Sequence, residues 1–163
     1  MQTVRFISDP HFGHENMARR RGFGSVEEHD DHFIQQFNDV VRSQRDITYI
    51  LGDITMAKQA HIEKLKHLNG IKHVALGNHD KRGHSPWILN YVTSVFGSLK
   101  YKDTLVTHVP IHPQELSYGK ILYCIHGHIH ENTLDDNRYW NVSAEVIDYR
   151  PKTYEELKDM YLK

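Results

Sequence analysis

Cysteine is almost absent from this sequence of 163 residues, in which Cys124 is the only one. The chain therefore cannot form an internal disulfide, which excludes the small secreted scaffolds that depend on such bonds. Cys124 lies in the apolar run 121–125, so we expect a buried thiol that packs as a small hydrophobic side chain. Met1 leads almost directly into the apolar run 4–7, without the basic region of a secretory leader. These features predict a cytoplasmic protein.

Long hydrophobic runs and an excess of charge of one sign are also missing. No apolar stretch approaches the ~20 residues of a membrane-spanning helix, so we expect no membrane partner. The net charge of -1 lacks the basic balance that is typical of proteins gripping extended nucleic acids. The sequence also has no repeat or linker, and its length suits one domain over residues 1–163. Nothing in the sequence indicates an oligomeric state.

Histidine, by contrast, is abundant, with 14 residues that form no consecutive run. It is the most common metal ligand and the side chain that most often transfers protons near neutral pH. Many of these histidines are ordinary surface or core residues. Their positions relative to the predicted strands therefore have to decide which of them are functional.

Helix-like stretches alternate with short apolar runs in the first half, and strand-like runs dominate the second. The expected strands are 3–8, 47–51, 72–76, 98–102, 104–107, 121–125 and 139–147. The expected helices are 25–43, 57–68, a short one after Pro86, and 153–162. Ser25 with Glu28, and Thr153 with Glu156, have the spacing of capping boxes. This order predicts an α/β sandwich with mixed sheets.

Five of the strand-like runs end in residues that can bind metal ions. The five segments are Asp9-Pro10-His11, Asp53, Asn78-His79-Asp80, His108 and His128-Ile129-His130. Functional residues of α/β folds gather beyond the carboxyl ends of strands, so these segments can converge on one edge. Gly52, Gly77 and Gly127 are expected to let the backbone turn sharply there. Each segment alone is weak evidence, whereas all five in this order predict a metal site.

In this order the five segments resemble the signature of the calcineurin-like metallophosphoesterases, from Asp9 to His130. The resemblance implies a four-layer α/β/β/α sandwich of two mixed sheets, with the metal site at the carboxyl ends of strands. The small size implies a compact member without a cap domain, as in bacteria and phages. The segment His11-Phe12-Gly13-His14, followed by Asn16, fits that subgroup.

The family pattern further implies two divalent ions that share one carboxylate. One ion would be held by Asp9, His11, Asp53 and His130. The other would be held by Asp53, Asn78, His108 and His128. His79 would be the general acid, oriented by Asp80. The sequence departs from the family at Gly52-Asp53-Ile54-Thr55-Met56, where the family often places another polar residue at the last position, so polar support near Asp53 is missing.

The ligand types support this chemistry independently of the family. Two divalent ions and two carboxylates leave a net positive site, which attracts phosphate oxygens and acidifies a water between the ions. Mixed imidazole, carboxylate and amide ligands favour manganese or iron first, and zinc, cobalt or nickel next. Magnesium and calcium, which prefer oxygen ligands alone, fit less well.

Four further residues are candidates for binding the substrate. Arg20 and Arg21 follow the first metal segment, and one of them could grip a phosphate bidentately, although a solvated helix end is the alternative. His14 and Asn16 are near enough in sequence to line the site.

The sequence thus predicts a metal-dependent hydrolase acting on phosphate esters. We expect small phosphorylated substrates, nucleotide-like ones first, and a diester before a monoester because an uncapped metal edge is open. A nucleotide pyrophosphohydrolase is an alternative enzyme. A non-catalytic interaction scaffold, as in the retromer subunit of this fold, is an alternative of another class. The complete ligand set together with His79 argues against the scaffold.

Overall fold

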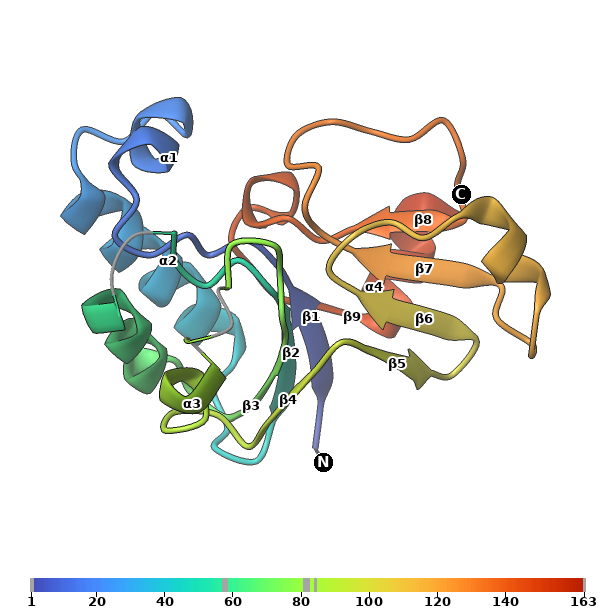
Figure 1. The fold of residues 1–163 in the computed structure, drawn as a ribbon, viewed down its shortest axis with the longest axis horizontal. Coiled ribbons are helices and arrows are strands. Elements are labelled where there is room, and N and C mark those ends of the chain that lie inside the picture. Colours follow the sequence, from blue (N-terminus) through green and yellow to red (C-terminus); the bar gives the residue numbers. More distant parts are fainter. Residues whose placement is uncertain (1, 57–58, 81–82, 84, 163) are drawn as a thin grey trace.

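Two β-sheets face each other in the computed structural model, which describes residues 2–56, 59–80, 83 and 85–162 (Figure 1). The first sheet has the strand order β4-β3-β2-β1-β9. Its strands are β1 (Val4–Ile7), β2 (Ile47–Leu51), β3 (Ile71–Ala75), β4 (Ser94–Phe96) and β9 (Lys152–Thr153). Strands β1 to β4 are parallel and β9 is antiparallel to β1. The apolar runs in β1 and β2 reflect burial on both faces, which parallel strands require.

The second sheet has the order β5-β6-β7-β8. Its strands are β5 (Ser98–Tyr101), β6 (Thr104–Thr107), β7 (Tyr123–His126) and β8 (Tyr139–Asn141). Strand β5 is antiparallel to β6, whereas β6, β7 and β8 are parallel. Both sheets are therefore mixed, and the predicted sandwich is confirmed.

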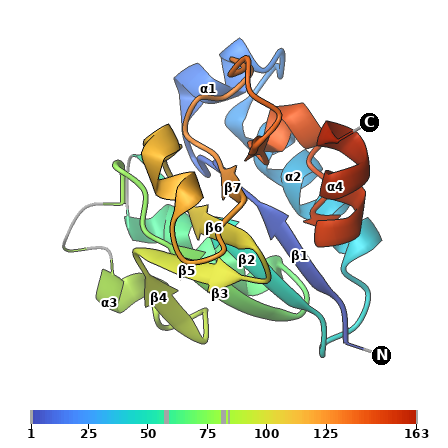
Figure 2. The same ribbon diagram turned by 90° about the vertical axis from the view of Figure 1, so that its right-hand side faces the viewer.

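Helices cover the outer face of the first sheet (Figure 1). They are α2 (Val26–Val40), the 3-10 helix η1 (Gln59–His67) and α3 (Ser85–Ile88), whereas α1 (Glu15–Arg20) packs against α2 and lies above it in Figure 1. Helix α4 (Tyr154–Tyr161) instead packs against β9, β1 and β8, on the side of the molecule opposite to α2 in Figure 1 and in full view in Figure 2. Its predicted capping box between Thr153 and Glu156 is present. Ser25 also caps α2 as predicted, although the Glu28 carboxylate accepts its bond from Gly24.

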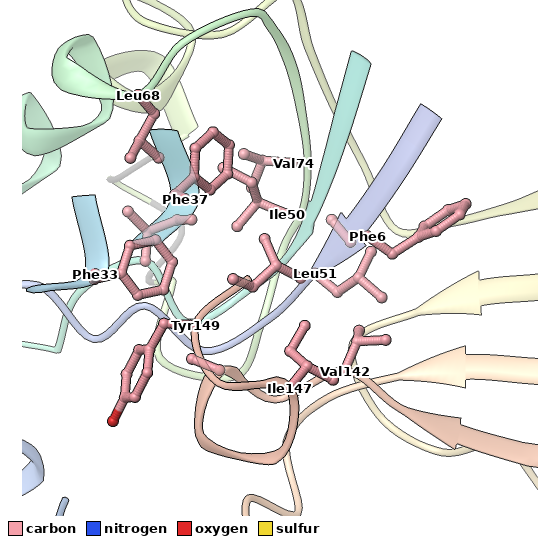
Figure 3. Close-up of a cluster of buried hydrophobic side chains, with 14 of the residues drawn as sticks. Phe6, Phe33, Phe37, Ile50, Leu51, Leu68, Val74, Val142, Ile147 and Tyr149 are labelled. Atoms are coloured by element: carbon pink, nitrogen blue, oxygen red, sulfur yellow. The ribbon is translucent and has the colours of Figure 1, made fainter. Parts of the chain in front are cut away.

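The first sheet has a buried core on each of its faces. Phe33 and Phe37 of α2 pack over Ile50 and Val74 on one face (Figure 3). On the other face Phe6 meets the ring of Tyr101, from the second sheet, edge to face at 5.2 Å between ring centroids. Burying each such phenyl ring contributes ~1.5–3 kcal/mol to the free energy of unfolding.

The outer layer on the second sheet is thinner. Cys124 and Tyr139 point away from the sandwich and pack with Leu116 of the 3-10 helix η2 (Pro113–Ser117). Cys124 is buried, as predicted, and its burial raises the pKa of the thiol to about 11. No helix among the described residues is both long and apolar enough to cross a membrane.

The expected strand over 139–147 is wrong beyond Asn141. The chain leaves the second sheet there, and Ser143 forms a parallel bridge with Ser8 of the first sheet before the 3-10 helix η3 (Ala144–Ile147) begins. The segment joins the two sheets, which an alternating apolar pattern cannot reveal. The helix expected over 57–68 is η1, and residues 57 and 58 lie outside the described residues.

Candidate metal centre

The carboxyl ends of five parallel strands bring the predicted ligands into two clusters. The first ligand group consists of Asp9, His11 and His130, and the second ligand group of Asp53, His108 and His128. Within each group, the potential ligand atoms lie within 4.8 Å of one another. Asn78 joins the second group, because its Oδ1 is 2.9 Å from His108 Nε2 and 2.8 Å from His128 Nδ1.

In the first ligand group, buried ligand atoms lack hydrogen-bond partners. The Asp9 Oδ2 atom accepts from the Ser143 hydroxyl at 2.9 Å and from the His128 N–H at 3.0 Å. Asp9 Oδ1 and both ring nitrogens of His11 are buried, with no partner among the described residues. Unpaired buried polar atoms are costly, and a coordinated cation would remove that cost. The group therefore fits a metal ion.

Burial is the largest influence on the pKa values of His11 and Asp9 in the first ligand group. Burial, reinforced by the nearby Arg21 guanidinium, lowers the pKa of His11 to about 2. The ring is therefore neutral near pH 7 and keeps a lone pair for coordination. Burial also raises the pKa of Asp9 above its usual value, against the opposing charges of His108 and His130. A divalent ion would favour the ionised carboxylate.

Asp53 belongs to the second ligand group and also faces the first. Its Oδ1 accepts from the His79 backbone N–H at 2.9 Å. Its Oδ2 is 3.7 Å from His11 Nε2 in the first group and 3.4 Å from His108 Nε2 in the second. Burial alone would raise the pKa of Asp53, but the hydrogen bond and charge of His108 lower it to about 2. An ionised carboxylate in this place fits a ligand shared by two ions.

The His108 ring is oriented by the backbone. Its Nδ1 donates to the Leu51 carbonyl at 2.6 Å, which leaves Nε2 for the second ligand group. Hydrogen bonds of this kind select the tautomer and the direction of a ligating histidine.

Five of the residues in these groups have left-handed backbone conformations, which are uncommon outside glycine. Their φ values are 58° at Asp9, 49° at His11, 53° at Asp53, 71° at His128 and 55° at His130. Such conformations persist only where the surroundings hold them, and they cluster at functional sites.

The three glycines at the strand ends act in two ways. Gly52 has a φ of 84° and makes the sharp turn that we expected. Gly77 and Gly127 do not have a positive φ, so the expected reason is wrong for them. A Cβ atom on Gly77 would overlap the Asp53 carboxylate, and one on Gly127 would overlap Ser8 Oγ and the Asp9 carboxylate. Their missing side chains let the ligand carboxylates approach the backbone.

Asp80 has a different role from the one that we expected. Its carboxylate accepts backbone N–H groups of Asp53, Ile54 and Gly77 at 2.8, 3.0 and 2.8 Å, rather than bonding to the His79 ring. It thereby ties the turn after β2 to the turn after β3. Asp80 supplies the polar support near Asp53 that is missing from the sequence around Met56.

His79 and His14 flank the first ligand group without belonging to it. Each ring lies 5.9 Å from the His11 ring, measured between centroids. His14 caps α1, because its Nδ1 accepts the Met17 N–H at 2.9 Å. Asn16 is exposed on α1.

The two arginines predicted to bind substrate are in contrasting environments. The Arg21 side chain is only 2% exposed and forms an ion pair with Glu145. It cannot reach a substrate in solution, so that expectation is wrong. Arg20 is half-exposed and pairs with Glu131 at 2.5 Å.

Two residues around the ligands were not identified from the sequence. Ser143 bonds to Asp9, and Glu145 Oε1 lies 2.7 Å from His130 Nδ1. Ser143 is far from Asp9 in the chain, and the segment that carries both residues was assigned to a strand. No local pattern could have placed them here.

Comparison with known proteins gives a consistent family. The family model described as calcineurin-like phosphoesterase matches residues 3–160. An uncharacterised protein of Methanocaldococcus jannaschii is 37% identical over 93% of this chain and 86% of its own length. A protein of Mycobacterium phage D29 is 35% identical over 50% of this chain and 42% of its own length.

Solved structures share the fold. A protein of unknown function from Aquifex aeolicus superposes with a TM-score of 0.76 at 25% identity, over 98% of this chain and all of that one. A structure described as a novel archaeal phosphodiesterase gives a TM-score of 0.53 at 16% identity, over 87% of this chain and 82% of that one. The second likeness concerns the fold alone.

Proposed function

This chain belongs to the calcineurin-like phosphoesterase family, and on that premise we propose that it hydrolyses phosphodiesters at a centre of two metal ions. The observation that carries the proposal is the position of Asp53, whose Oδ2 faces both ligand groups. The unpartnered, buried atoms of Asp9 and His11 support it.

Each ion would take its ligands from one side of Asp53 and share Asp53 itself with the other ion. One ion would be held by Asp9, His11, His130 and Asp53, and the other by Asp53, Asn78, His108 and His128. When bound, two such ions acidify a water and stabilise charge on the attacking and departing oxygens. Manganese or iron as the native metal and the cytoplasm as the location remain predictions.

Two histidines beside the first ligand group would act on the substrate directly. His79 would protonate the departing oxygen, and its backbone bond to Asp53 Oδ1 fixes the position of the residue beside both groups. In His14, the Met17 N–H occupies Nδ1, so the neutral ring carries its proton on Nε2. That N–H could donate to a phosphate oxygen of the substrate.

The preference for a diester rests on how open the edge is. Asn78 is exposed, and His79 and His128 are half-buried, so solvent reaches the second ligand group. An edge of this kind can admit both arms of a diester. Small, nucleotide-like diesters are the substrates that we propose first.

A substrate panel on metal-reconstituted protein tests the proposal. It contains an aryl diester, an aryl monoester, cyclic nucleotides, dinucleotides and a nucleotide with a diphosphate linkage. We expect the diesters to be hydrolysed fastest and a chelator to abolish activity. Full activity in chelator would refute the metal centre. A faster reaction with the monoester, or with the diphosphate linkage, would refute the diester preference.

A further inference from the structure

The carboxylate of Glu145 contacts the ring of His130, the third residue of the first ligand group. Its Oε1 is 2.7 Å from His130 Nδ1, so the ring donates there and leaves Nε2 for an ion. The Glu145 side chain is 16% exposed. The carboxylate therefore fixes both the tautomer and the direction of the His130 ring.

Arg21 connects Glu145 to the backbone of the first ligand. Its Nη2 lies 2.5 Å from Glu145 Oε2 and donates to the Asp9 carbonyl at 2.8 Å. Its Nη1 also donates to the Pro10 carbonyl at 3.4 Å. One buried guanidinium thus touches the turn that carries Asp9 and the carboxylate that orients His130. A lysine could not reproduce this arrangement, because it lacks the planar set of donors.

Arg21 is also connected, through His29 and Asp30, to Gly13, which lies shortly after the segment Asp9-Pro10-His11. Arg21 Nη1 lies 2.9 Å from His29 Nε2, and His29 Nδ1 lies 3.0 Å from Asp30 Oδ1. The Asp30 carboxylate in turn accepts the Gly13 N–H at 3.1 Å. These contacts are consistent with one tautomer, in which His29 accepts from Arg21 and donates to Asp30. The segment 9–13 is therefore held at both ends by one network.

We propose that Glu145 and Arg21 are positioning residues for the first ligand group and act selectively on the ion bound there. The inference rests on the proposed two-ion centre. Asp9, His11 and His130 all have left-handed φ values, which must be held by their surroundings. Among the described residues, no hydrogen bond joins Glu145 or Arg21 to a member of the second ligand group. Outer partners of ligands typically change metal affinity by about 10–100-fold.

A second ion pair provides a matched control. Arg5 and Asp46 pair at 3.2 Å, and their side chains are 15% and 8% exposed. The pair joins β1 to the residue before β2, toward the amino ends of these strands and away from the metal edge. Asp46→Asn therefore removes an ion pair of similar burial without touching either ligand group.

The test is a Mn²⁺ titration of metal-free protein, with bound ions counted by electron paramagnetic resonance. We compare wild type, Glu145→Gln, Arg21→Lys and Asp46→Asn, and record a melting curve of each in chelator. We expect two ions in wild type and in Asp46→Asn. In Glu145→Gln we expect a loss of ~10–100-fold in affinity for one ion, with the other unchanged. Arg21→Lys should shift the same ion, and it serves as the second variant if Glu145→Gln does not fold.

The outcomes separate this inference from the proposed function. Wild type binding fewer than two ions would overturn the two-ion centre itself. Two ions in wild type, with both affinities preserved in Glu145→Gln and Arg21→Lys, would overturn the positioning role alone. Equal weakening of both ions in these variants, or the same weakening in Asp46→Asn, would also overturn it, because either result indicates general loosening.

Discussion

The two ligand groups differ in exposure to solvent at one added ligand. Each group combines two buried residues with one half-buried histidine, whereas Asn78, which joins the second group, is exposed. An ion in the first group would exchange with solvent slowly. An ion in the second group would keep contact with water and leave more easily. We therefore expect two unequal affinities.

The groups also differ in what holds them. Side chains from distant segments support the first group, through Ser143, Glu145 and Arg21. Groups close to the strand ends support the second, through the Leu51 carbonyl, the His79 N–H and the Asp80 carboxylate. The second group is thus built largely from the geometry of neighbouring parallel strands, and the first depends on contacts between residues that are far apart in the chain.

The largest expected effect is that of Asp53→Asn, because Asp53 faces both groups. We expect this variant to lose both ions at micromolar metal, and its activity with them, whereas Asn78→Ala should weaken only the second ion. Each ion that binds at 100 times its Kd contributes ~2.7 kcal/mol to the free energy of unfolding. The melting temperature in saturating Mn²⁺ should therefore fall further for Asp53→Asn than for Asn78→Ala. Equal metal content in the two variants would contradict the proposal that both ions share Asp53.

His79→Asn should have the next largest effect, and this variant separates catalysis from metal binding by the two ligand groups. General acid catalysis contributes ~10²–10⁴-fold, so turnover of a diester with an alkoxide leaving group should fall by that factor. Metal content and stability should stay near those of wild type, because the His79 ring is in neither group. The loss should shrink for a nitrophenyl leaving group, which departs without a proton.

Comparing the two leaving groups decides the role of His79. An equal fractional loss for both substrates would contradict an acid role. Loss of a metal ion in the variant would contradict it as well, since the ring would then be acting on a ligand group.

The same difference between the groups explains what the sequence could reveal. The ends of β1, β2, β3, β6 and β7 could be recognised from apolar runs followed by polar residues, because parallel strands bring their carboxyl ends to one edge. The ligand residues could therefore be proposed from the sequence. Glu145 could not, because its contact with His130 depends on the turn into η3.

Other errors have similar physical causes. Arg20 and Arg21 are neighbours with the same chemistry, and only tertiary contacts bury Arg21. Asp80 follows His79 directly, yet its carboxylate lies closer to the backbone of two turns. Gly127 signalled a turn, whereas its function is to make room for Asp9.

Gly127→Ala should have an intermediate effect that is confined to the first group. The added Cβ would overlap Ser8 Oγ and the Asp9 carboxylate, and overpacking of this kind costs ~1–3 kcal/mol. We expect weaker binding of the first ion with the second retained. Gly77→Ala should instead displace Asp53 and weaken both ions.

Gly97→Ala is the matched control for these glycine variants. A Cβ there meets no atom of the described residues within 4 Å, so stability should change by no more than ~0.5 kcal/mol. A Mn²⁺ titration and a melting curve of each variant make the comparison. Equal weakening of both ions in Gly127→Ala would contradict the separation between the groups.

Arg20→Ala should have the smallest effect. Its neighbours Arg19 and Arg21 have the same side chain, so the sequence alone does not distinguish the three. The Arg20 guanidinium pairs with Glu131, which directly follows the ligand His130, but both side chains are largely exposed. Exposed pairs contribute little to stability, so the melting temperature and both metal affinities should stay at wild-type values. If the guanidinium instead contacts a substrate phosphate, truncation removes binding that is equal in ground and transition states, and KM should rise by up to ~10-fold with kcat unchanged. An unchanged KM would show that the Arg20 guanidinium does not contact the substrate. A lost metal ion would show that Arg20 supports the first group as Arg21 does, and the contrast between these two neighbours would fail.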